Sequence, residues 1–149
     1  LFPEARVKKF IEMRGADGGP WRRLCALPAF WVGLMYDQSA LDGAWDLVKD
    51  WDAETREELR IAASTHGLQA EVGGLKMHDL AREAVALSEA GLKARARPGA
   101  GGLVPDETHF LNALRDSIET GRVPADDLLA DYHGPWNGDL SRIYAEYSY

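Results

Sequence analysis

Residues 6–14 carry the pattern that most constrains the fold, because their side chains alternate with a period of two and lead directly into a glycine-rich turn. A period of two is typical of a β-strand. One face of this strand would carry Val7, Lys9, Ile11 and Met13, and the other would carry Arg6, Lys8, Phe10, Glu12 and Arg14. Gly15, Gly18 and Gly19 then allow backbone conformations that other residues resist. We therefore expect a strand and a glycine loop within residues 1–20.

The polar face of this strand would present Glu12 and Arg14 side by side. A carboxylate can bind a hard cation such as Mg²⁺, which prefers oxygen ligands. An arginine guanidinium is planar and always charged, and it suits bidentate binding of phosphate. Cross-strand ion pairs and solvated strand faces produce the same Glu-x-Arg pattern. Taken alone, these residues leave both interpretations open.

Residues 21–149 predict about six helices, so the fold class is α+β and mostly α-helical. The first expected helix covers residues 21–36 with a kink at Pro28, and the second begins after an N-cap at Ser39. The third covers residues 53–65, with Asp52 as N-cap and Gly67 as stop, and the fourth covers residues 77–94. Further helices are expected over 106–120 with Gly121 as stop, from Pro124 to Gly134, and over about 140–147. Residues 68–76 are ambiguous, with Gly73-Gly74 favouring a loop, and residues 95–105 are expected to be a loop. Trp45, Trp51 and Trp136 are expected to be core or staple residues rather than a platform for stacking bases.

Charge and composition exclude several classes of function. The chain has 17 Lys and Arg against 24 Asp and Glu, a net charge of −7, so duplex nucleic acid and anionic membranes are poor partners. The longest apolar run, 26–36, is too short to span a bilayer, and no signal peptide is recognisable, so we expect a cytoplasmic location. The four histidines lack metal-binding spacing, which argues against zinc. A local basic patch comprises Arg6, Lys8, Lys9, Arg14, Arg22 and Arg23, and it could equally be a solvated strand and helix start.

A long contiguous block at the start of the chain resembles one family. It consists of Phe2-Pro3-Glu4, Phe10-Ile11-Glu12-Met13-Arg14-Gly15-Ala16-Asp17-Gly18-Gly19-Pro20-Trp21, Leu24-Cys25-Ala26-Leu27-Pro28-Ala29 and Trp31-Val32-Gly33-Leu34. This block resembles glutamate–cysteine ligase (γ-glutamylcysteine synthetase) of the plant and proteobacterial type. The resemblance is dense to about Asp37 and thinner in the rest of the chain.

The resemblance implies an ATP-dependent ligase that joins the γ-carboxylate of glutamate to the amine of cysteine through a γ-glutamyl phosphate, the first step of glutathione biosynthesis. It implies a glutamine-synthetase-like fold, to which this chain would contribute one or two strands of an antiparallel sheet. Glu12 would then be a Mg²⁺ ligand, and Arg14 would be the catalytic residue that holds the transferring phosphoryl group of ATP. Phe10 and Trp21 would contact substrate, although Trp21 could instead anchor the helix start. Asp17 could cap the glycine turn.

The chain begins at Leu1 without methionine and resembles the C-terminal portion of such enzymes. We therefore expect a segment of one catalytic domain, with residues 1–20 as active-site strand and loop and residues 21–149 as the helical part. Its expected partners are glutamate, cysteine, ATP and the N-terminal remainder of the parent enzyme, and an exposed sheet edge could support a homo-oligomer. The isolated segment would be inactive.

Three alternatives stay open: a related ligase with another acceptor amine, a non-catalytic helical interaction module, and a small protein whose strand pairs with a hairpin partner or a second copy.

Cys25 is the only cysteine and is expected to be a buried thiol. Plant members of the resembled family are redox-regulated through disulfides, and a disulfide partner for Cys25 would lie outside this chain.

Overall fold

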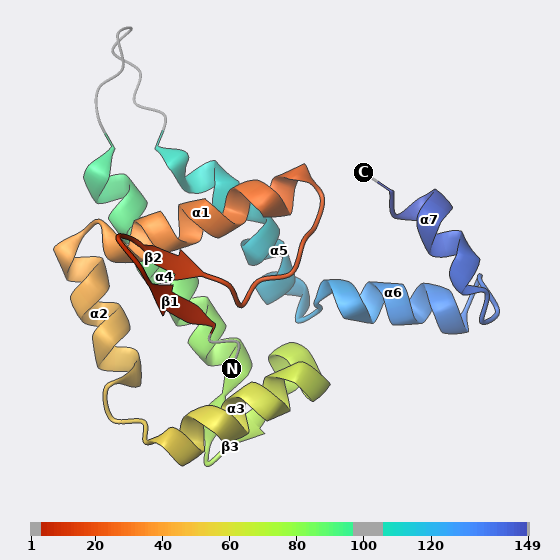
Figure 1. The fold of residues 1–149 in the computed structure, drawn as a ribbon, viewed down its shortest axis with the longest axis horizontal. Helices are drawn as coiled ribbons and strands as arrows, with labels where there is room; N and C mark the ends of the chain where they lie inside the picture. Colours follow the sequence, from red (N-terminus) through yellow and green to blue (C-terminus); the bar gives the residue numbers. More distant parts are fainter. Residues whose placement is uncertain (1–3, 97–105, 149) are drawn as a thin grey trace, which may run out of the picture.

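The fold is organised around two crossing helices, α1 (Trp21–Met35) and α4 (Met77–Arg95), in a computed structural model that describes residues 4–96 and 106–148 (Figure 1). The other helices are α2 (Gln38–Val48), α3 (Ala53–His66), α5 (Asn112–Thr120), α6 (Pro124–His133) and α7 (Ile143–Glu146). Short 3₁₀ turns cover Gly67–Gln69, Glu107–Leu111 and Leu140–Arg142. Two antiparallel two-stranded sheets complete the described part: β1 (Ala5–Val7) with β2 (Ile11–Met13), and β3 (Glu71–Val72) with β4 (Leu75–Lys76). The expected α+β, mostly helical class is confirmed.

The core lies where α1, α4 and the start of α5 meet. Leu92 and Leu111 are 1% and 0% exposed and contact the buried Ala29. At the crossing, Gly33 and Gly91 bring the two backbones together, because a Cβ atom added to Gly91 would overlap the carbonyl oxygen of Gly33. The hydroxyl of Ser88 donates a 2.9 Å hydrogen bond to the carbonyl oxygen of Phe30, so this buried polar group is satisfied.

Most helix boundaries confirm the sequence prediction. Asp52 caps α3 by accepting a 2.8 Å hydrogen bond from the amide of Thr55, and Gly67 ends that helix at a φ of 54°. Gly121 ends α5 in the left-handed region. Pro28 lies inside α1 without ending it.

The predicted N-cap at Ser39 is wrong. Asp37 is the N-cap of α2, because its carboxylate accepts a 3.0 Å hydrogen bond from the amide of Ala40. Residues 68–76 are not a plain loop. They contain a tight hairpin whose turn residues, Gly73 and Gly74, have φ values of 56° and 85°, a backbone shape that two-residue hairpin turns require.

The single strand predicted over residues 6–14 is also wrong, because the chain turns back at residues 8–10. The amide of Lys8 donates a 2.8 Å hydrogen bond to the carbonyl oxygen of Phe10 and closes the turn. Val7 pairs with Ile11, so both lie on one face of the hairpin, as the alternation had indicated. A three-residue turn preserves the period of two, and the pattern therefore could not distinguish one long strand from a short hairpin.

The last part of the chain forms an arm of α6 and α7 that extends away from the α1–α4 crossing (Figure 1). Trp136 is 2% exposed, as predicted, and its indole nitrogen donates a 2.9 Å hydrogen bond to Glu146. The interior position predicted for Trp45 is wrong, because its side chain is 61% exposed on α2, and Trp51 is half-buried. The final helix is shorter than expected, since a 3₁₀ turn takes its first residues. The predicted loop at 95–105 falls mostly outside the described residues.

Candidate functional site

The N-terminal hairpin places Glu12 opposite Arg6 on the neighbouring strand. Arg6 pairs with Glu12 across the two strands, and the Arg6 Nη2 atom lies 2.6 Å from Oε2 of Glu12. The Lys8 ammonium lies 3.6 Å from the same oxygen. In the described residues the carboxylate of Glu12 is thus balanced by cations of its own hairpin. The structure therefore contains the cross-strand ion pair that the residues alone had left open.

No group of three or more acidic, histidine or cysteine side chains able to hold a metal ion is found among the residues that the structure describes. Mg²⁺ takes oxygen ligands and keeps near-ideal octahedral geometry. Glu12, already paired with Arg6, would supply one carboxylate to such a site. Residues 4–96 and 106–148 therefore do not by themselves fit a magnesium centre, and the assignment of Glu12 as a metal ligand stays a prediction.

Arg14 follows β2 directly and its side chain is exposed. Its backbone amide donates a 2.7 Å hydrogen bond to the carbonyl oxygen of Glu4, which continues the hairpin by one more bond. The position is therefore fixed through the backbone while the guanidinium faces solvent. The predicted role in phosphate binding stays a prediction.

The two aromatic residues assigned to substrate are both exposed. Phe10 is 61% exposed at the hairpin turn, with the Lys8 ammonium 5.7 Å from its ring centroid. Trp21 is 77% exposed at the first position of α1, so its alternative interpretation as a packed anchor is wrong. Contacts of either side chain with substrate stay predictions.

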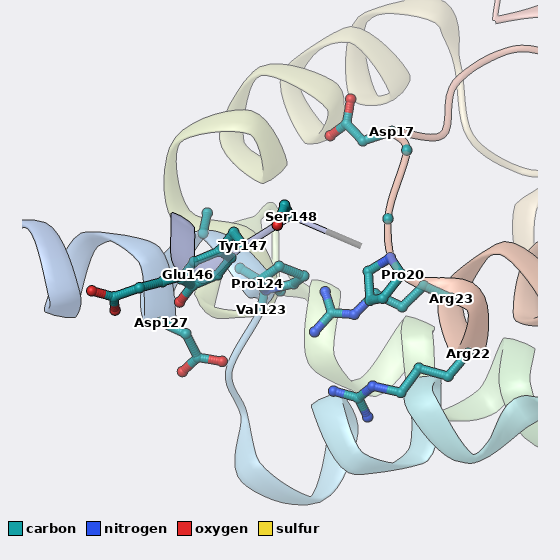
Figure 2. A pocket seen from close by; sticks show the side chains of 13 residues that line it. Asp17, Pro20, Arg22, Arg23, Val123, Pro124, Asp127, Glu146, Tyr147 and Ser148 are labelled. Carbon is teal, nitrogen blue, oxygen red and sulfur yellow. The ribbon is translucent and has the colours of Figure 1, made fainter. Parts of the chain in front are cut away.

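The glycine loop after the hairpin forms one wall of a cavity of about 570 Å³. The start of α1 continues this wall, and the start of α6 with the end of the chain forms the opposite wall (Figure 2). The side chains of Arg22 and Arg23 point into the space between the walls, whereas the carboxylate of Asp17 points away from both (Figure 2). The lining residues are Asp17, Gly18, Gly19, Pro20, Arg22, Arg23, Val123, Pro124, Ala125, Asp127, Glu146, Tyr147 and Ser148.

Sequence reasoning found one wall of this cavity and missed the other. Arg22 and Arg23 belong to the predicted basic patch, and Gly18 and Gly19 belong to the predicted glycine loop. Residues 123–127 and 146–148 lie about a hundred positions further along, and no motif marks them. Only the path of α5 and α6 brings them to the loop.

Most charged groups that line the cavity already have partners. Arg122 lies 2.8 Å from Asp127, and Glu146 lies 2.6 Å from Arg142. The hydroxyl of Tyr147 donates a 2.6 Å hydrogen bond to Asp131, and this bond raises the pKa of Tyr147 to about 12. The wall formed by the C-terminal arm is therefore fixed by local ion pairs and carries little free negative charge.

The sequence comparisons identify the family. The family model described as "Glutamate-cysteine ligase family 2 (GCS2)" matches residues 1–146 of this chain. The chain is 44% identical over 149 residues to the chloroplastic glutamate–cysteine ligase of Nicotiana tabacum and 45% identical over 150 residues to that of Solanum lycopersicum. It is 42% identical to the chloroplastic enzyme of Arabidopsis thaliana. In each case all of this chain is matched to 27% of the relative.

The chain belongs to glutamate–cysteine ligase family 2, which confirms the family named from the resemblance. It spans about a quarter of the length of these curated relatives. The expected placement in the C-terminal portion of such enzymes is not supported by the alignments. None of the helices in the described residues is long and apolar enough to cross a bilayer.

Proposed function

We propose that this chain is part of an ATP-dependent glutamate–cysteine ligase that acts in glutathione biosynthesis. The observation that carries the proposal is the family match over residues 1–146, which includes the contiguous block from Phe10 to Trp21. The substrates would be glutamate, cysteine and ATP, with Mg²⁺ accompanying the nucleotide. We further propose a glutamine-synthetase-like fold for the intact enzyme, in which residues 1–149 belong to a single catalytic domain.

The proposed reaction has two steps. The γ-carboxylate of glutamate attacks the terminal phosphorus of ATP and releases ADP, which leaves a γ-glutamyl phosphate. The amine of cysteine then attacks the acyl carbon, loses a proton and displaces inorganic phosphate as the amide forms. Phosphoryl transfer asks the protein mainly for positioning and charge stabilisation. Arg14 suits this task, because its backbone is held in the hairpin by the bond to Glu4 while its exposed guanidinium can bind a phosphoryl group.

The proposed role of Glu12 requires a rearrangement. Its carboxylate would have to leave Arg6 and Lys8, and the remaining oxygen ligands would have to come from other parts of the protein. Both ion pairs are partly solvent-exposed, so separating them costs little, on the order of 1 kcal/mol or less.

The hairpin also supports a proposal about partners. The side chains of Val7 and Ile11 are 82% and 53% exposed on one face, and an isolated two-stranded sheet is marginally stable in water. We propose that further strands of the intact enzyme cover this hairpin, and that a second copy of the protein is the alternative.

For the cellular location we propose the cytoplasm. The plant relatives are described as chloroplastic, and that description applies to those proteins.

The ligase proposal is tested with Arg14→Ala in the intact protein that contains these 149 residues. We expect a loss of phosphate release of about a hundredfold or more with glutamate and cysteine present, because a phosphate-clamping arginine acts mainly on the transition state. Arg82→Ala is the matched control, since it removes the same charge from an exposed position on α4. Equal activity of the two variants would remove Arg14 from the mechanism.

Two further measurements test the finer assignments. A panel of acceptor amines, with phosphate release as the readout, distinguishes cysteine ligation from a related ligase with another acceptor. Glu12→Gln is expected to lose activity in a way that higher Mg²⁺ partly restores; a loss that does not respond to Mg²⁺ would show that Glu12 is not a metal ligand.

A further inference from the structure

We propose that the cavity beside the glycine loop is an anion-binding site centred on Arg23, and that it takes the phosphoryl or carboxylate group of a small molecule. The Nε atom of Arg23 is inaccessible to solvent and has no hydrogen-bond partner among the described residues. A buried donor without a partner is costly, and more so on a charged group. The guanidinium end of the same side chain points into the cavity (Figure 2), and an oxyanion held there by its terminal N–H groups would offset part of this cost.

The local backbone is built to hold Arg23 in this position. Gly19 is buried, and a Cβ atom added there would lie 3.2 Å from the Cβ and 3.4 Å from the Cδ of Arg23. Any side chain at position 19 would therefore press on the aliphatic part of Arg23. The glycine lets that side chain lie along the loop and turn its guanidinium into the cavity (Figure 2).

The start of α1 adds donors to the same space. Pro20, the N-cap residue, has no N–H and no capping side chain, and no acidic residue occupies the first turn. The amides of Arg23 and Leu24 donate to the carbonyl oxygen of Pro20 at 2.8 and 3.1 Å. The first amides of any α-helix lack partners within the helix and form its positive end. Arg23 and this helix end therefore present positive charge to one cavity.

The acidic residues of the lining do not neutralise Arg23. Asp127 and Glu146 are paired with Arg122 and Arg142, and the carboxylate of Asp17 points away (Figure 2). Arg22 lies 3.2 Å from Asp116, in a pair whose side chains are both 60% exposed. Such a surface pair is weak, so Arg22 can turn toward an anion at little cost.

The size and surroundings of the cavity indicate an anion carried by a larger molecule. Its volume of about 570 Å³ is in the range of small-molecule sites. Arg23 also borders a second cavity of about 390 Å³ between α1, α4 and α5, which is mostly apolar and includes Leu27, Phe30, Leu114 and Ile118. A ligand could place its anionic group at Arg23 and a less polar part in this groove.

The proposal does not depend on the ligase activity, and it is tested by binding alone. Pyrophosphate and glutarate are titrated separately into the isotope-labelled protein, and NMR follows the amides of Trp21 and Arg22 and the Nε–H of Arg23. We expect saturable shifts of these three signals with at least one probe. Tighter binding of pyrophosphate would identify a phosphoryl site, and tighter binding of glutarate would identify a carboxylate site.

Arg23→Ala is expected to lower the affinity for the more tightly bound probe about tenfold to a hundredfold, because charge-assisted hydrogen bonds are lost. Arg23→Lys should keep part of the affinity as a point charge, and Arg82→Ala should change it less than about twofold. Absence of saturable shifts with both probes in the unmodified protein would overturn the proposal even if Arg23→Ala does not fold. Unchanged affinity in a folded Arg23→Ala variant would overturn it as well.

Discussion

The α1–α4 crossing and the N-terminal hairpin both carry apolar side chains, yet those at the crossing are buried and those of Val7, Phe10 and Ile11 on the hairpin are exposed. Leu92, beside the crossing, is 1% exposed, whereas Val7 on the hairpin is 82% exposed. The crossing is held by close backbone packing around Gly33 and Gly91. The hairpin is held by its own backbone bonds and by the exposed Arg6–Glu12 pair. Stability therefore resides in the helices, and the hairpin can change its contacts at small cost.

The strongest test of this comparison is Gly91→Ala. A methyl group there would overlap the carbonyl oxygen of Gly33 and would contact Ala40, so the two helices would have to separate. We expect a loss of about 3 kcal/mol in the free energy of unfolding, measured by urea denaturation. Gly18→Ala is the control, because a Cβ atom at that position has nothing within 4 Å, and it should change stability by less than about 0.5 kcal/mol. Similar losses in both variants would show that the crossing is not the stabilising region.

The C-terminal arm offers a test of intermediate size, Tyr147→Phe. The hydrogen bond from Tyr147 to Asp131 stabilises the protonated phenol and raises its pKa from 10.0 to about 12 in the folded protein. In the unfolded chain the phenol loses its proton near pH 10. The stabilisation is therefore fully present below pH 10 and is lost as the pH rises from 10 to about 12.

We expect Tyr147→Phe to cost about 1 kcal/mol near neutral pH, with the difference from the unmodified protein shrinking above pH 10. Thermal unfolding of both proteins across this pH range is the measurement. A difference that stays constant through pH 12 would mean that the Asp131 bond does not cause the effect.

The smallest effect is expected on the hairpin, from a double-mutant cycle of Arg6→Ala and Glu12→Ala. The side chains of this pair are 42% and 32% exposed, so the coupling energy should be about 0.5 kcal/mol or less. Added salt should reduce it further. A coupling energy above about 2 kcal/mol would show that the hairpin is as firmly held as the helices and would contradict the comparison.

The sequence was informative wherever a local rule decides the structure. Asp52 and Gly67 mark the ends of α3 because a capping carboxylate and a left-handed glycine act on adjacent backbone groups. The block from Phe10 to Trp21 identified the family without any structure. It also indicated the glycine loop and the two arginines that follow it.

Predictions from the sequence were wrong where two different local structures are compatible with the same pattern of residues. Alternation over residues 6–14 is compatible with one strand or with a hairpin, because a three-residue turn keeps the side-chain faces unchanged. Both Asp37 and Ser39 are good N-cap residues, and the choice of Asp37 follows from the tight turn between α1 and α2. The pairing of Glu12 with Arg6 could not be predicted from the pattern, since it depends on where the chain reverses.

The sequence by itself determined the family, the position of most helices and the ends of α3 and α5, because each of these depends on residues close together in the chain. Tertiary structure alone decided which residues meet across long separations. It brought Val123 and Tyr147 to the glycine loop, seated Gly91 against Gly33, and left the Nε atom of Arg23 buried without a partner. These contacts follow from how whole helices pack, and helix packing depends on side-chain shape and loop path rather than on local pattern.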